Sequence, residues 1–300
     1  MNAIEITNLS KSFRGLYAVD HLNMTVPVGA IYGFIGENGS GKSTTEKLIC
    51  GHLVPDKGEI KLFGKDYTDA GVRVRVGALI ENAGCFPGSS VRDNLKMQAI
   101  NLGIENPDEE IIRVLQIVRM EDSSGIKFKS CSLGMKQRIG IAMALLGNPA
   151  LLILDEPING LDTDGIRIMR EILVDITKNY NCTVLISSHI LGELEKIATH
   201  YGIIHQGRMI QEISAKEMES RARVFVSVKT KDMQGAENIL KAKFEHVSKE
   251  DEYLQIYDVD HTEAIVEYLL QNGHVVREIK KNKIGLEEYY IKLMSKKEES

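Results

Sequence analysis

Residues 36–44 read Gly36-Glu37-Asn38-Gly39-Ser40-Gly41-Lys42-Ser43-Thr44. They fit the pattern G-x-x-x-x-G-K-[ST], which follows a strand and opens a helix in proteins that bind phosphate chains. Here the apolar run Ile31–Ile35 precedes the pattern and a helical segment follows it. Glycines let the backbone wrap a phosphate chain, so that its N–H groups face the anionic oxygens. The stretch therefore predicts a nucleotide-binding loop whose contacts come from Gly36, Asn38, Gly39, Ser40, Gly41, Lys42, Ser43 and Thr44.

The side chains of this loop indicate its chemistry. Lys42 is expected to bridge the β- and γ-phosphates, and the Ser43 hydroxyl to bind Mg²⁺. A second apolar run, Leu151–Leu154, ends in Asp155 and Glu156. A buried parallel strand delivers its functional groups at its C-terminal end. We therefore expect Asp155 to bind Mg²⁺, directly or through water, and Glu156 to orient and polarise an attacking water molecule.

Strand-like runs alternate with helical patterns along the first 215 residues. The runs are Ile31–Ile35, Leu151–Leu154, Thr183–Ile186 and Tyr201–His205. This order predicts an α/β core with a largely parallel sheet that helices cover on both faces. Helical spacing replaces the strand signal between Pro87 and Gly147, so a mostly helical insert of about residues 87–147 is expected inside a domain of residues 1–215.

The pattern changes after Ser214. Alternating and helical runs then follow one another at Val224–Val228, Met233–Lys243, Tyr253–Tyr257, His261–Gln271, Val275–Ile279 and Leu286–Met294. They predict a small C-terminal α+β accessory domain over residues 216–300, for which a ferredoxin-like arrangement is one candidate. No catalytic constellation is visible in it, so a regulatory or docking role is the simpler interpretation.

The composition argues against several classes of protein. A net charge of −5 gives no basic field to attract nucleic acid. The longest apolar runs are far shorter than the roughly 20 residues that cross a bilayer, and the N-terminus, MNAIEITNLSKSF, shows no export signal. The cysteines have no C-x-x-C spacing, which favours reduced thiols in a cytosolic protein; they are Cys50, Cys85, Cys131 and Cys182.

With these motifs in order, residues 1 to about 215 resemble the nucleotide-binding subunits of ABC transporters. The family's signature segment is similar to Cys131-Ser132-Leu133-Gly134-Met135-Lys136-Gln137-Arg138. Ser132, which lies 23 residues before Asp155, and Gly134 match the usual Ser and second Gly. The resemblance implies that both contact the γ-phosphate of ATP held by the opposite subunit. Two positions depart from the common Gly and Gln, namely Leu133 and Met135, so backbone donors at the helix start must carry much of that contact.

Three further segments resemble parts of the family's nucleotide site. Asn159-Gly160-Leu161-Asp162 is similar to the loop that links the two sites, which implies a place for Asp162 beside the nucleotide. Ser187-Ser188-His189 is similar to the switch-histidine segment, so His189 is expected to hydrogen-bond the γ-phosphate and report its presence. Phe13 lies 23 residues before Gly36, where the family stacks an aromatic ring on adenine, and the nearby Tyr17 is an alternative.

The finer resemblance is to the bacitracin-resistance and lantibiotic-immunity branch, whose single-domain ATPases pair with separately encoded membrane subunits. It rests on Ala78-Leu79-Ile80-Glu81-Asn82, on residues 132–138 and on Leu286-Glu287-Glu288-Tyr289-Tyr290. Glu81 stands where most ABC proteins carry glutamine. It follows the strand-like run Val76–Ile80 and precedes the helical insert, so it is expected to touch both the catalytic Mg²⁺ region and the surface facing a permease, with a carboxylate that can bind the cation. Two departures stay unexplained: Ile158, where Thr is usual, and Glu46, at a normally apolar position.

The resemblance implies an ATP-binding and ATP-hydrolysing subunit. Two copies would close around two ATP molecules and drive a separate integral membrane permease, from a cytoplasmic position on the inner face of the cell membrane, to expel a peptide antibiotic. The alternative is a soluble ABC ATPase that acts on the ribosome or on nucleic acid, but the chain has no second ATPase domain, long coiled coil or basic composition. A kinase or GTPase using the phosphate loop alone would leave Ser132 and His189 without a role.

Overall fold

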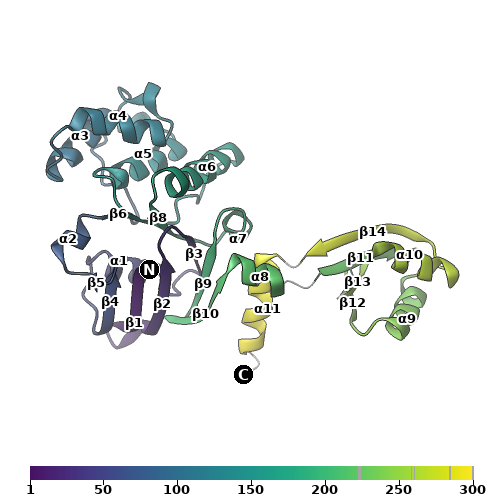
Figure 1. Cartoon of the computed structure of the whole chain (residues 1–300). Coiled ribbons are helices and arrows are strands. Elements are labelled where there is room, and N and C mark those ends of the chain that lie inside the picture. The colour runs from purple at the N-terminus through teal and green to yellow at the C-terminus, as the bar shows by residue number, and fades with distance from the viewer. Residues whose placement is uncertain (222–223, 258, 260, 284, 299–300) are drawn as a thin grey trace. The chain divides into compact units, whose positions relative to one another are not determined.

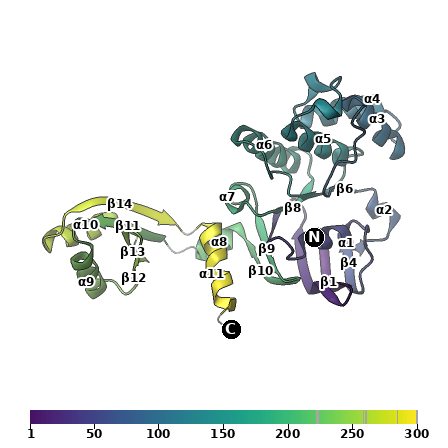
Figure 2. The same ribbon diagram turned by 180° about the vertical axis from the view of Figure 1, so that it is seen from behind.

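The structure is a computed structural model that describes residues 1–221, 224–257, 259, 261–283 and 285–298. The chain divides into two compact units, Met1–Ala215 and Lys216–Ser300, which Figure 1 shows from one side and Figure 2 from behind. Each unit has a hydrophobic core of its own.

A six-stranded sheet with the order β10-β9-β3-β8-β7-β6 forms the centre of the first unit. Strand β10 runs antiparallel to β9, and the other five strands are parallel. The chain is apolar along β3, β7 and most of β8 because these strands are buried on both faces. The predicted α/β core with a largely parallel sheet is thus confirmed. The strands are β3 (Ile31–Ile35), β6 (Val76–Leu79), β7 (Leu151–Asp155), β8 (Thr183–Ser188), β9 (His200–His205) and β10 (Arg208–Ser214).

A second, antiparallel sheet in this unit was not predicted. Its order is β2-β1-β4-β5, with β1 (Asn2–Phe13), β2 (Leu16–Pro27), β4 (Lys57–Leu62) and β5 (Lys65–Asp66). Register shifts interrupt the pairing of β1, and Asn8 has a left-handed backbone. Such bulges break the period of two by which a half-buried strand is recognised in a sequence. The sheet shares one core with β3 and β7.

The helices of the first unit form two groups, one within residues 87–147 and the other along the central sheet (Figure 1). Ser90 opens α3 with a capping box to Asp93, and Pro107 occupies the first turn of α4. The bounds are α1 (Lys42–Ile49), α2 (Ala70–Arg73), α3 (Val91–Asn101), α4 (Pro107–Ile117), η1 (Glu121–Ser123), η2 (Phe128–Ser130), α5 (Leu133–Leu145), α6 (Thr163–Asn179) and α7 (Leu191–Leu194). Helix α8 (Ala215–Arg221) begins at the last residue of the first unit and otherwise belongs to the second.

The second unit contains a four-stranded antiparallel sheet with the order β12-β13-β11-β14. The elements follow one another as β11 (Val224–Thr230), α9 (Met233–Lys243), β12 (Val247–Glu250), β13 (Tyr253–Tyr257), α10 (Thr262–Gln271), β14 (Val276–Lys283) and α11 (Leu286–Glu298). The order βαββαβ is that of ferredoxin-like folds. Strand β12 was missed because, of its four residues, Val247 alone is apolar and it is only half-buried.

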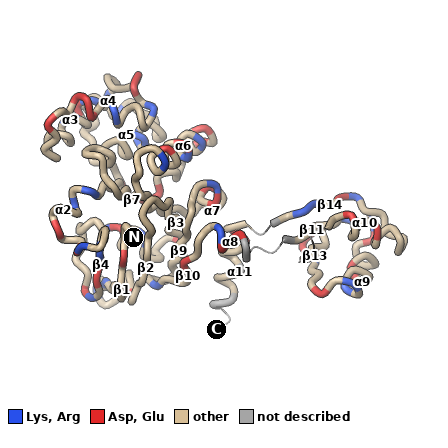
Figure 3. The backbone as a smooth tube through the Cα atoms, in the orientation of Figure 1, with Lys and Arg blue, Asp and Glu red and all other residues tan. Residues whose placement is uncertain are grey.

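The surfaces of both units carry charges of both signs. Figure 3 shows Lys and Arg interspersed with Asp and Glu along the backbone of each unit. This distribution agrees with the small net charge of the chain. Among the described residues, no helix has both the length and the apolar character needed to cross a membrane.

Candidate nucleotide-binding and catalytic site

The predicted chemical groups follow neighbouring strands of the central sheet. The parallel strands β6, β7, β8 and β3 lie side by side in that order. Glu81 comes after β6, Asp155 and Glu156 end and follow β7, His189 follows β8, and residues 36–44 follow β3. Because the carboxyl ends of parallel strands meet at one edge of a sheet, the fold brings these groups together. We call residues 36–44, Asp155, Glu156 and His189 the strand-end site.

The loop of residues 36–44 forms a close backbone cradle. A Cβ atom on Gly36 would lie 2.5 Å from both the Ile204 carbonyl oxygen and Ser40 Oγ, and one on Gly41 would collide with the Ala18 carbonyl. Ser40 Oγ is buried and has no hydrogen-bond partner among the described residues. Since buried hydroxyls normally find a partner, this one fits a phosphate oxygen as its missing acceptor. Asn38 and Gly39 are exposed at the tip of the loop.

Lys42 is almost buried, with 5% of its surface exposed. Its Nζ donates hydrogen bonds to the carbonyl oxygens of Gly36, at 2.6 Å, and of Glu37, at 3.0 Å. An ammonium group has three donors, so one remains for a phosphate oxygen. Ser43 and Thr44 are half-buried in the first turn of α1. The loop thus presents a cation, hydroxyl groups and a helix N-terminus at one place, which suits a chain of phosphates.

Ser187 on β8 connects the two carboxylates that β7 delivers. Its hydroxyl donates a 2.8 Å hydrogen bond to Asp155 Oδ1 and accepts a 3.1 Å hydrogen bond from the N–H of Glu156. The Glu156 backbone is left-handed, with φ of 48°, a conformation that most residues avoid. No role of its own was predicted for Ser187. Its direct alignment with Asp155 in the β7–β8 register is the signal that could have identified it.

Glu156 and His189 form a pair across β7 and β8. The distance between His189 Nδ1 and Glu156 Oε2 is 2.6 Å. The Glu156 carboxylate is therefore held in one direction by an imidazole ring, as a group that aligns a water molecule requires. The ring itself is about half exposed and can reach a ligand.

Glu46 lies on α1, and its carboxyl group is near the Asp155 carboxylate and the Ser187 hydroxyl. It is completely buried beside Ser187 and Asp155, and among the described residues neither of its oxygens makes a hydrogen bond of normal geometry. Burial, and then the negative charge of Asp155, raise the pKa of Glu46 to about 8. The neutral acid is thus the form that this environment favours, which explains how a glutamate fits at a normally apolar position.

The Glu81 carboxylate contacts Lys47, whereas its position in the sequence suggested contact with Mg²⁺. Lys47 Nζ on α1 lies 2.5 Å from Glu81 Oε1, and the hydrogen bond from this ammonium group lowers the pKa of Glu81. The carboxylate is 62% exposed and the backbone is left-handed, with φ of 65°. Contact between Glu81 and Mg²⁺ stays a prediction.

The remaining signature residues line a separate pocket of about 410 Å³ between α5 and α6, which we call the signature pocket. Ser132 caps α5 by accepting the Met135 N–H, and Asp162 caps α6 by accepting the Gly165 N–H at 2.8 Å. A Cβ on Gly134 would meet only Leu161, at an ordinary 3.7 Å. No residue of 36–44 lines the pocket. Within one chain, Ser132 and Gly134 therefore line a pocket that the phosphate loop does not share.

Two aromatic rings near the first β-hairpin remain candidates for stacking on a base. Phe13 ends β1 and is 46% exposed, with Lys11 Nζ 5.7 Å from the centre of its ring. Tyr17 on β2 is 54% exposed and precedes Ala18, whose carbonyl faces Gly41. Both rings are available to a ligand, and the choice between them stays open.

A divalent cation fits the strand-end site only together with a phosphate chain. Among the described residues, no cluster of three or more His, Cys, Asp or Glu could hold a metal by itself. Mg²⁺ commonly binds through one or two protein oxygens plus substrate phosphates and water. Ser43 and Asp155 supply hydroxyl and carboxylate oxygens of that kind.

The fold and this site define a P-loop nucleotide hydrolase. The bacitracin transport ATP-binding protein BcrA of Bacillus licheniformis is 36% identical over 297 residues, which cover 97% of each chain. The profile described as ABC transporter matches residues 19–159. The chain belongs to the ABC transporter ATP-binding family and is an ATP hydrolase of the ABC type.

Other relatives agree with this assignment. The lantibiotic transport ATP-binding protein SrtF of Streptococcus pyogenes is 37% identical over 222 residues, 74% of this chain and 95% of its own. The solved structure of cbiO1 from Clostridium perfringens, part of the ABC transporter complex cbiONQ, has a TM-score of 0.67 and 26% identity, over 73% of this chain and 91% of that chain. A dimeric cassette bound to ADP and Pi, MJ0796, shares the fold at a TM-score of 0.64 and 20% identity, over 71% of this chain and 98% of its own.

Proposed function

We propose that two copies of this chain close around two ATP molecules, each held between the strand-end site of one copy and the signature pocket of the other. The observation that carries this proposal is the separation of the two sets of residues. Ser132, Gly134 and Asp162 line a pocket to which residues 36–44 contribute nothing. In the proposed arrangement, a second copy supplies Ser132 and Gly134 to the γ-phosphate bound at Lys42.

The residues of the strand-end site divide the work of hydrolysis. Lys42 and the backbone N–H groups of the loop hold the β- and γ-phosphates, and Ser43 and Asp155 would hold Mg²⁺. When bound, Mg²⁺ offsets the charge that develops on the phosphate oxygens. Glu156, fixed by His189, orients the water for in-line attack, and the other ring nitrogen of His189 would meet the γ-phosphate.

We further propose that closure drives a separate membrane permease that expels a peptide antibiotic, with the chain on the cytoplasmic face of the membrane. The support is the similarity to proteins named for bacitracin and lantibiotic transport. Glu81, exposed between the strand-end site and the start of residues 87–147, is placed to pass the state of the nucleotide to a partner. The named substrates belong to those relatives, and selectivity would lie in the permease.

Mixing two inactive variants tests the shared site. Lys42→Ala removes phosphate binding from one copy, and Ser132→Arg fills the signature pocket of the other. In a mixed dimer, one of the two composite sites keeps both intact residues. We expect each variant alone to show no ATP-dependent pairing by size-exclusion chromatography with light scattering, and the mixture to regain it. Mixtures that stay monomeric, although both variants are folded, would contradict the proposal.

A further inference from the structure

The two walls of the signature pocket come from different parts of the first unit. Ser132, Gly134 and Arg138 belong to the start of α5, whereas Asp162 and Gly165 belong to the start of α6. The distance between these walls decides whether both can contact one nucleotide. Side chains that connect α5 to α6 therefore bear on the spacing of the pocket walls.

Arg138 ties α5 to the end of α4. Its Nη1 donates hydrogen bonds to the carbonyl oxygens of Arg119, at 2.9 Å, and Val118, at 3.5 Å. Carbonyl groups at the end of a helix lack partners within the helix, and a guanidinium is favoured there by the helix dipole. Arg138 lies one turn after Gly134, so α5 is fixed at the turn that presents the signature residues.

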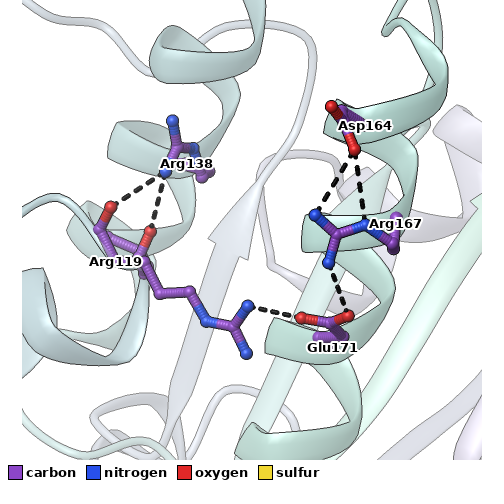
Figure 4. Close-up of polar contacts among 6 residues, drawn as sticks. Arg119, Arg138, Asp164, Arg167 and Glu171 are labelled. Carbon is purple, nitrogen blue, oxygen red and sulfur yellow. Dashed lines mark hydrogen bonds and ion pairs between the residues drawn. The ribbon is translucent and has the colours of Figure 1, made fainter.

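Arg119 continues this connection to α6 (Figure 4). Its guanidinium lies 2.5 Å from Glu171 on α6, and Glu171 also accepts a 2.9 Å hydrogen bond from Arg167. Arg167 in turn contacts Asp164, in the first turn of α6 beside the cap Asp162. Hydrogen bonds from Arg119 and then Arg167 lower the pKa of Glu171, so its carboxylate is ionised at neutral pH.

The backbone at Arg119 makes an arginine an unexpected choice. Helix α4 ends in a Schellman motif, in which the Met120 N–H bonds the Leu115 carbonyl and the Arg119 N–H bonds the Gln116 carbonyl. Arg119 occupies the left-handed position of this motif, with φ of 57°, where glycine is strongly preferred. A residue that the local backbone disfavours points to a use for its side chain.

We propose that Arg119 and Glu171 are positioning residues that hold the two walls of the signature pocket at the spacing a nucleotide requires. The inference rests on the proposed closure of two copies around ATP. Both side chains are nearly half exposed, so the pair contributes little to folding stability. Its effect should therefore appear in ATP-dependent pairing rather than in unfolding.

The variant that separates these effects is Arg119→Gly. It removes the guanidinium and, at the same time, supplies the residue that the left-handed position prefers, so the thermal midpoint should not fall. In a Glu156→Gln background, which would accumulate the ATP-bound pair, we expect pairing to need about 3 to 10 times more ATP. ADP affinity, which reports the strand-end site alone, should stay within about twofold.

Charge exchange provides the second test. Arg119→Glu and Glu171→Arg should each weaken pairing, and the double variant should pair better than either single variant, because the Arg119–Glu171 contact is restored with reversed signs although the hydrogen bond from Arg167 is lost. Arg92→Glu is the matched control: it breaks an exposed Arg92–Asp108 pair of 3.0 Å between α3 and α4, neither of which lines the pocket. It should leave pairing unchanged.

The outcomes separate this inference from the function on which it rests. If Arg119→Gly pairs as readily as its parent, or if the charge exchange fails to rescue a folded protein, the positioning role is wrong and the proposed function stands. If the Glu156→Gln parent itself never pairs with ATP, the proposed function fails and the inference fails with it. A loss of pairing that Arg92→Glu reproduces would show a general effect of surface charge and would also overturn the positioning role.

Discussion

The strand-end site and the signature pocket differ in how firmly burial and hydrogen bonds within the chain hold their side chains. In the strand-end site, Lys42 is nearly buried, and hydrogen bonds of 2.6–3.1 Å connect Asp155, Ser187, Glu156 and His189. In the signature pocket, Ser132 and Asp162 cap helices, and a Cβ on Gly134 would make only an ordinary contact with Leu161. The first region is organised before any ligand arrives. The second offers helix starts and open surface, which suits contact with another molecule.

The largest effect should follow from removing the carboxylate of Glu156. Glutamine keeps the shape and can still hydrogen-bond His189, but it cannot accept a proton or polarise water as a carboxylate does. We expect Glu156→Gln to bind ATP with nearly unchanged affinity and to hydrolyse it at least about 100-fold more slowly. Single-turnover hydrolysis and equilibrium binding measure the two quantities. A monomeric variant with full activity would remove Glu156 from the mechanism.

A pair of glycine substitutions tests the comparison directly. Gly36→Ala places a Cβ 2.5 Å from a backbone carbonyl, whereas the Cβ of Gly134→Ala would make an ordinary 3.7 Å contact. The first should therefore lower ATP affinity at least about tenfold, a loss of about 1.4 kcal/mol. The second should keep the ADP affinity and thermal midpoint of the parent but weaken ATP-dependent pairing.

Isothermal titration calorimetry and light scattering on both glycine variants distinguish the outcomes. Equal losses of ADP affinity in the two variants would mean that the regions do not differ as the structure indicates. Normal pairing by Gly134→Ala would show that the signature backbone tolerates a methyl group at the nucleotide interface.

The last prediction concerns folding stability rather than nucleotide chemistry, at the buried carboxyl group of Glu46 beside Asp155. Glu46 is fully buried, so its replacement by methionine, which is similar in length, removes a buried polar group that has no hydrogen bond of normal geometry among the described residues. We expect Glu46→Met to raise the free energy of unfolding by about 1–3 kcal/mol. Differential scanning calorimetry without nucleotide measures it, as an upward shift of the thermal midpoint.

Glu46→Gln is the control, because it keeps the polar atoms and should give no such gain. If Glu46→Met instead destabilises the protein, the carboxyl group makes a favourable contact with Asp155 or Ser187, and its burial is not a cost. A fall in hydrolysis without a change in stability would assign Glu46 a part in orienting Asp155.

The sequence by itself determined the class of the fold and predicted which residues follow β3, β7 and β8 at the strand-end site, whereas the chemical roles of those residues stay predictions. A phosphate-binding loop has to be written in consecutive residues, because neighbouring N–H groups must converge on one ligand, and buried parallel strands such as Leu151–Asp155 are continuous apolar runs. Local sequence patterns also made the helices of residues 87–147 visible, and the alternating and helical runs after Ser214. The antiparallel sheet of the first unit was not predicted, because bulges disrupt the two-residue alternation of its strands.

Only the tertiary structure decided which distant side chains meet. The Ser187 link between Asp155 and Glu156 depends on the register of β7 and β8, and the pairing of Glu81 with Lys47 depends on how α1 lies beside the end of β6. The Arg119–Glu171 contact joins residues 52 positions apart, through a backbone turn that favours glycine. Such contacts arise from packing. They could not be inferred from the sequence, because residues that meet in space have no fixed spacing along the chain.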